Sequence, residues 1–120
     1  MLTEVLKSRL CRDLLEEVDT IGDLVVAITS FAYPNGDSVN LFVENQGDEL
    51  VVSDEGTTLR FLRHQNVELT KDRQDIIKAM CASYGVEFQL PRLVKRCDPL
   101  AIGIGFMEFC EAVMRISSVG

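Results

Sequence analysis

The chain has 120 residues, of which 47% are hydrophobic, and its 19 acidic and 12 basic residues give a formal net charge of −7. This length suits a single domain over residues 1–120 and leaves no room for a second domain of similar size. The average field of so acidic a chain repels a phosphate backbone, so direct nucleic-acid binding is not expected.

Four cysteines, Cys11, Cys81, Cys97 and Cys110, are spread along the chain without a CxxC pair or a histidine at zinc spacing. A zinc site is therefore not expected. At least three of them lie in apolar helical patterns, which predicts buried, reduced thiols. The N-terminus alternates charged and apolar residues, and no apolar run approaches the ~18 residues that crossing a membrane requires. We expect a cytoplasmic protein without a membrane segment.

The N-terminal third predicts one helix and one strand. Apolar residues from Leu2 to Val18 recur at three- and four-residue steps, which predicts an amphipathic helix that breaks at Gly22. The run from Leu24 to Phe31 is rich in β-branched residues and apolar on both faces, as is typical of a covered or central strand.

The middle of the chain predicts a meander. Asn35-Gly36-Asp37 favours a tight hairpin turn, and Val39–Val43 alternates as a strand with one buried face. A second turn at Gln46-Gly47-Asp48 leads into a strand over Leu50–Val52. These segments, with the strand before them, predict three antiparallel strands.

A helix over Glu55–Gln65 follows, with Ser53 or Asp54 in position to cap it. Gly56 in its first turn leaves space for a close approach of backbone or of a partner. His64 stands late in this helix, where a cation near the C-terminus is favourable, and this explanation outweighs a catalytic one.

The second half predicts two more helices and one more strand. Thr70 caps a helix that ends at Gly85, and Val86–Leu90 alternates as a short strand before Pro91. Asp98 and Pro99 open a last helix over about residues 98–117.

This last helix is apolar nearly all round, which is more than one core-facing stripe needs. Either it is central and covered on several sides, or it carries an association surface, most simply of a homodimer. The candidate interface residues are Ile102, Phe106, Phe109 and Val113.

Together these elements predict an α+β domain with helices packed on an antiparallel sheet of about four strands. The expected order is α-β-β-β-α-α-β-α.

The stretches Gly36-Asp37 before a strand and Asp54-Glu55-Gly56 at a helix start resemble the bacterial and phage domain-of-unknown-function family 1828. The resemblance covers about residues 3–90 and leaves the last helix outside. It implies this fold pattern and an origin in bacteria, phages or mobile elements. It implies no activity, cofactor or catalytic residue.

The leading hypothesis is a small, acidic, non-enzymatic module that binds another protein. The partner is expected to be basic and to handle nucleic acid, as when a phage or mobile-element protein inhibits or regulates a bacterial defence complex. The candidate binding residues are Asp37, Asp48, Asp54, Glu55 and Gly56. No cofactor or metal is expected for this role.

Two alternatives stay open. One is a Mg²⁺-dependent, nuclease-like hydrolase that uses the carboxylates of Asp37, Glu44 and Asp54. It lacks the acidic residue followed two positions later by lysine that a restriction-type core needs, because Asn45 and Gln46 follow Glu44. The other is a structural or regulatory subunit that dimerises through its last helix.

Overall fold

The computed structural model describes residues 15–22 and 24–119. Within these ranges the chain is an α+β protein with one six-stranded sheet and three α-helices. The strands are β1 Leu15–Ile21, β2 Leu24–Ala32, β3 Ser38–Gln46, β4 Glu49–Ser53, β5 Glu87–Gln89 and β6 Arg92–Cys97. The helices are α2 Thr57–His64, α3 Lys71–Ser83 and α4 Ile102–Ile116, and a 3-10 turn, η1 Pro99–Ala101, precedes α4.

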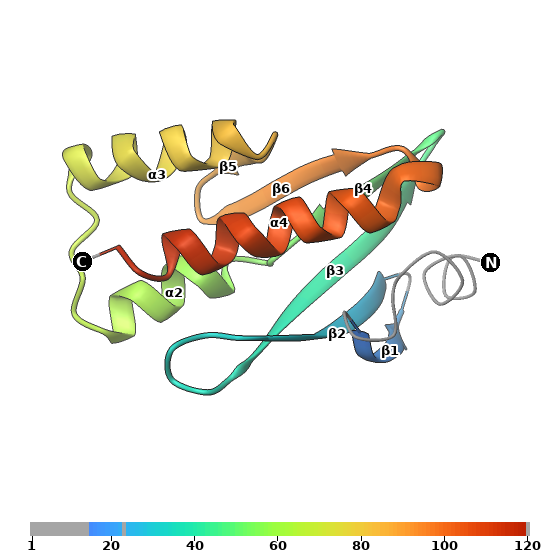
Figure 1. Ribbon diagram of the computed structural model, residues 1–120, viewed down its shortest axis with the longest axis horizontal. Coiled ribbons are helices and arrows are strands. Elements are labelled where there is room, and N and C mark those ends of the chain that lie inside the picture. The colour runs from blue at the N-terminus through green and yellow to red at the C-terminus, as the bar shows by residue number, and fades with distance from the viewer. Residues whose placement is uncertain (1–14, 23, 120) are drawn as a thin grey trace.

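The sheet is antiparallel throughout and runs in the order β1-β2-β3-β4-β6-β5. Helices α2 and α4 pack against β6, while α3 packs against β5 and α4. Figure 1 shows α4 running along β6 and β4, with α2 and α3 flanking its C-terminal half. The helices therefore gather over the β4-β6-β5 side of the sheet.

The hydrophobic core lies between the sheet and α4. On β3, Val39, Leu41 and Val43 are fully buried, which confirms the predicted alternation. Their core neighbours come from β2, β4 and β6 and from the inner face of α4. The meander of β2, β3 and β4 is confirmed as well, and its first turn closes where Gly36 N donates to the Tyr33 carbonyl at 2.8 Å.

The predicted N-terminal helix is wrong for Leu15–Val18, which belong to β1, and its remainder lies outside the described residues. β1 pairs with β2, with Ile21 opposite Leu24 and Gly22 at φ 61° in the turn between them. Residues 17–21 pair with β2 in continuous register, and the register shifts between Leu15 and Glu17. The tertiary pairing overrides the local helical spacing.

The sequence-based order also misses β6, which inserts between β4 and β5. β6 lacks the alternation of buried and exposed residues that would predict a strand, because Leu93, Val94 and Lys95 are all buried. Lys95 is accommodated because its ammonium Nζ donates to the Tyr84 carbonyl at 2.7 Å. The described part has six strands instead of the expected four, and three α-helices instead of four.

The expected starts of the later helices are confirmed. Thr70 caps α3, since its Oγ1 accepts a hydrogen bond from Arg73 N at 3.2 Å. Asp98 caps η1 by accepting from Leu100 N at 2.8 Å. The last helix thus begins with a 3-10 turn before it becomes α-helical.

Of the four cysteines, Cys81, Cys97 and Cys110 are buried free thiols, as predicted. Cys11 lies outside the described residues. Burial raises the pKa of Cys81 and of Cys97 to about 11, and that of Cys110 to about 12. These three thiols therefore stay protonated near neutral pH and are poor nucleophiles.

Helix α4 is central to the core but also exposes Ile104 and Met107, so the two explanations for its apolar excess are not exclusive. The four residues assigned to an interface, Ile102, Phe106, Phe109 and Val113, are fully buried in the core of the single chain. They present no surface to a partner, and their assignment is corrected accordingly. The sequence pattern identified an apolar helix but could not tell its inner face from its outer one.

Gly105 lets α4 approach β6 closely. A Cβ atom at this position would lie 2.5 Å from Cys97 Sγ. We expect Gly105→Ala to lower the free energy of unfolding by about 1–3 kcal/mol, because the overlap outweighs the gain of ~1 kcal/mol in helix propensity. Urea denaturation measures the change.

The double variant with Cys97→Ala provides the control, since it removes the sulfur that the new methyl group meets. Its loss of stability should be smaller than the sum of the two single losses. Additive losses would contradict the assigned contact.

Candidate functional site

Asp54, a predicted binding residue, is fully buried where β4 passes into α2. Its Oδ1 accepts hydrogen bonds from Gly56 N and Leu93 N, both at 2.9 Å. Its Oδ2 accepts from Thr58 N at 3.1 Å. The carboxylate therefore fastens the first turn of α2 and strand β6 to the end of β4.

The neighbours of Asp54 complete a structural corner. Ser53 Oγ accepts from Glu55 N at 2.9 Å. The predicted helix start is wrong by two residues, because α2 begins at Thr57 with Gly56, and neither Ser53 nor Asp54, at its N-cap position. Gly56 has φ 83°, and a Cβ there would lie 3.4 Å from the Pro91 carbonyl oxygen. The close approach expected at Gly56 is made by the chain itself. Of Asp54, Glu55 and Gly56, only Glu55 is exposed.

Asp37 lies in the loop between β2 and β3, where it is exposed and bonded to Asn35. Asn35 Nδ2 donates to Asp37 Oδ2, and Asp37 N donates to Asn35 Oδ1, both at 3.0 Å. The loop is held on α2 by Tyr33, whose hydroxyl lies 3.0 Å from Thr58 Oγ1. The Tyr33 ring also stacks on Phe61 with centroids 5.3 Å apart.

A polar cavity of about 490 Å³ lies between this loop and α2. Arg60 and His64, one helical turn apart on α2, line it together with Asp37 and Asn40, and neither Arg60 nor His64 has an ion pair among the described residues. Asn40 Oδ1 is buried and lacks a hydrogen-bond partner in the same part of the chain. The cavity can hold a small group that carries both an anionic oxygen and a donor. Sequence analysis missed Asn40 and Arg60, which belong to no motif.

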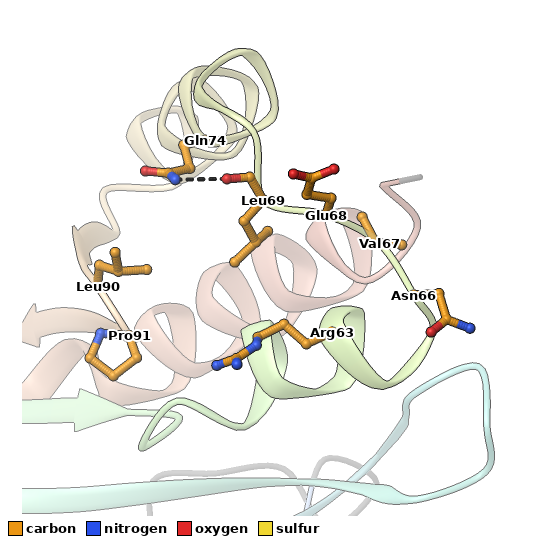
Figure 2. Close-up of a pocket in the computed structure, with 8 residues that line it drawn as sticks. All are labelled: Arg63, Asn66, Val67, Glu68, Leu69, Gln74, Leu90 and Pro91. Carbon is orange, nitrogen blue, oxygen red and sulfur yellow. Dashed lines mark hydrogen bonds between the residues drawn. The ribbon is translucent and has the colours of Figure 1, made fainter.

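A second cavity of about 600 Å³ lies on the other side of α2 (Figure 2). Figure 2 shows Leu69 and Leu90 pointing into the space above α2, and Arg63 extending toward Pro91. Gln74 Nε2 donates to the Leu69 carbonyl at 2.9 Å and fixes the upper wall. The lining combines Val67, Leu69, Leu90 and Pro91 with the charged Arg63 and Glu68 and the amides of Asn66 and Gln74, so the cavity can take a group with both apolar and polar parts.

The basic residues of β6 are matched by carboxylates of neighbouring elements. Their ion pairs are Arg92–Glu55 at 3.6 Å, Lys95–Glu108 at 3.7 Å, Arg96–Glu49 at 3.8 Å and Arg96–Glu87 at 3.7 Å. Arg92, Lys95 and Arg96 therefore each have an acidic partner within the chain. Glu44 and Asp48 are exposed and have no ion pair among the described residues.

The carboxylates of the nuclease hypothesis do not meet. Asp37 and Glu44 stand near opposite ends of β3, seven positions apart, which corresponds to about 23 Å along a strand. Asp54 is enclosed by backbone amides. In the part of the chain that the structure describes, no group of three His, Cys, Asp or Glu residues could hold a metal ion. Asp48, in the β3–β4 turn, is likewise remote from Asp37 along the strand.

Comparison with protein families identifies the class of this chain. The family model described as "Domain of unknown function DUF1828" matches residues 29–116, more than half of the chain. The chain belongs to this family. The match starts at residue 29 and not at about residue 3, and it extends beyond residue 90 to take in α4.

No curated protein and no solved structure matches the chain. Among the described residues, no helix is long and apolar enough to span a membrane.

Replacing Asp54 tests the structural corner. We expect Asp54→Ala to lower the free energy of unfolding by at least about 3 kcal/mol, because three buried N–H groups lose their acceptor. Asp54→Asn should lose less, since it keeps one acceptor oxygen. Glu55→Gln next to it should change stability by less than about 1 kcal/mol, because its ion pair is exposed. If urea denaturation shows that Asp54→Ala and Glu55→Gln lower the free energy of unfolding equally, the structural role assigned to Asp54 is contradicted.

The phenol of Tyr33 makes the free energy of unfolding depend on pH. Burial raises its pKa to about 12 from 10.0, while the hydrogen bond to Thr58 lowers it and the Asp54 charge raises it. The folded chain thus holds this proton more tightly than the unfolded chain. The resulting stabilisation is complete below pH 10 and is lost as the pH rises toward 12. The buried thiols act in the same direction from about pH 9.

We expect Tyr33→Phe to lose less stability than the parent chain between pH 10 and pH 12, by on the order of 2 kcal/mol. Urea titrations at fixed pH values measure this difference. Parallel losses in the two proteins would show that the phenol does not titrate with folding.

Proposed function

We propose that this chain is a non-enzymatic protein-binding module that recognises a basic partner. The observation that carries the proposal is the pairing of the three β6 cations with carboxylates of neighbouring elements of the same chain. These pairs tie up three cations, while acidic side chains such as Glu44 and Asp48 stay exposed without an ion pair among the described residues. An exposed acidic surface speeds encounter with a basic protein and disfavours nucleic acid.

A more specific form of the proposal is an inhibitor or regulator of a bacterial defence or nucleic-acid-handling complex. Exposed carboxylates compete with phosphate groups for the same lysine and arginine side chains. Buried free thiols at Cys81, Cys97 and Cys110 are in keeping with a reducing compartment, so the proposed encounter takes place in the cytoplasm.

The geometry favours binding over hydrolysis. Asp37 and Glu44 are separated along β3, and Asp54 already serves the backbone. Each of the two cavities beside α2 contains one arginine, Arg63 or Arg60, without an ion pair in the described part of the chain, so the cavities suit acidic groups and are not assigned to the basic partner.

Affinity capture from the source cells at moderate salt tests the proposal. We expect the tagged chain to retain one protein in stoichiometric amount, and we expect higher salt to release it because charge contributes to the contact. The matched control is Glu44→Lys with Asp48→Lys, which should reduce the recovered partner. Recovery of nucleic acid alone, or of no partner, would contradict the proposed function.

A further inference from the structure

Helix α4 and the turn before it expose a row of apolar side chains. Leu100 is 74% exposed, Ile104 69% and Met107 42%. Ile104 and Met107 stand three residues apart on one face of α4, and Leu100 lies in η1 just before the helix. We call these three residues the α4 ridge.

The ridge is not needed for the core, because the opposite face of α4 is already buried. Ile102, Phe106 and Phe109 have no exposed surface. Gly105 seats the helix directly on Cys97 of β6. The ridge is therefore held in place before any partner arrives, which lowers the entropy cost of binding.

The ridge is bordered by three carboxylates and by one cation, the exposed Arg115 one turn after Glu111. Asp98 is exposed two residues before Leu100, and Glu111 is exposed one turn after Met107. Glu108 lies beside the ridge and forms an ion pair with Lys95, whose Nζ is 3.7 Å from Glu108 Oε1. Asp98 and Glu111 have no ion pair among the described residues.

We infer that the α4 ridge inserts into an apolar groove of a partner protein whose rim carries lysine or arginine. Apolar anchors at i, i+4 and i+7 are the pattern by which a helix fills such a groove. The acidic border supplies the complementary charge and sets the orientation. This inference rests on the proposed function and names the surface and the partner chemistry.

The same charges disfavour a second copy as the occupant. Two ridges packed together bring Asp98 and Glu111 of both chains to one interface, between molecules that each carry a formal net charge of −7. Like charges across an interface oppose association. A basic partner relieves this repulsion.

Site-specific photocrosslinking tests the inference in the full-length chain. A benzophenone-bearing phenylalanine analogue replaces Ile104 in one protein and Ile76 in the control. Ile76 is a suitable control because it is 49% exposed on α3, away from the ridge. We expect crosslinking in source-cell lysate from position 104 and not from position 76, to a partner segment that contains apolar residues and lysine or arginine.

Charge and apolar variants of the chain then test the contact with the recovered partner by calorimetric titration. Ile104→Asp should weaken binding at least about tenfold, whereas Ile76→Asp should change it less than about twofold. Glu111→Lys should weaken binding and reduce its salt dependence, whereas Asp72→Lys, an equal charge change on α3, should not. Circular dichroism should show all four variants folded, since these side chains are exposed.

The outcomes separate the inference from the proposed function. A partner that co-purifies but crosslinks equally from positions 76 and 104, or from neither, overturns the ridge and leaves the binding function standing. Crosslinking to a second copy of the chain overturns the inference in favour of a homodimer. The absence of any captured protein overturns both.

Discussion

The buried carboxylate of Asp54 holds together three elements that are distant in sequence. It accepts backbone hydrogen bonds from Gly56 and Thr58 at the start of α2 and from Leu93 in β6. β6 can occupy its place between β4 and β5 only if its first residues are aligned with the end of β4, and this carboxylate makes that alignment. A buried charge is costly unless amides surround it, so the corner admits few other arrangements.

The structural role of Asp54 bears on function, because it leaves only Glu55 of the Asp54-Glu55-Gly56 motif exposed. Asp54 and Gly56 are buried, and the cations of β6 form ion pairs with carboxylates of the same chain. What is left for recognition is exposed acidic charge, two cavities beside α2 and the α4 ridge. The α4 ridge and its acidic border combine apolar area with charge, the two features that give a protein interface its affinity and its selectivity.

The sequence predicted the elements whose local signals agree with their tertiary setting. The Asn35-Gly36 turn, the alternating strand β3 and the cap at Thr70 are examples. It failed where long-range pairing decides the structure. Leu15–Val18 belong to a strand because they pair with β2. Strand β6 was missed because it buries Lys95, whose ammonium donates to the carbonyl of Tyr84, eleven residues earlier. The outer face of α4 and the cavity residues Asn40 and Arg60 carry no local signature, so only the packing of the elements reveals them.

Native-state hydrogen exchange of the amides of Gly56, Thr58 and Leu93 tests most directly whether Asp54 is a structural residue and not a binding residue. If the carboxylate secures the fold, these three protons exchange only through global unfolding, with the free energy that urea denaturation gives. Exchange through local opening, well below that free energy, would contradict this assignment. It would return Asp54, Glu55 and Gly56 to consideration as a site that a partner or ligand can reach.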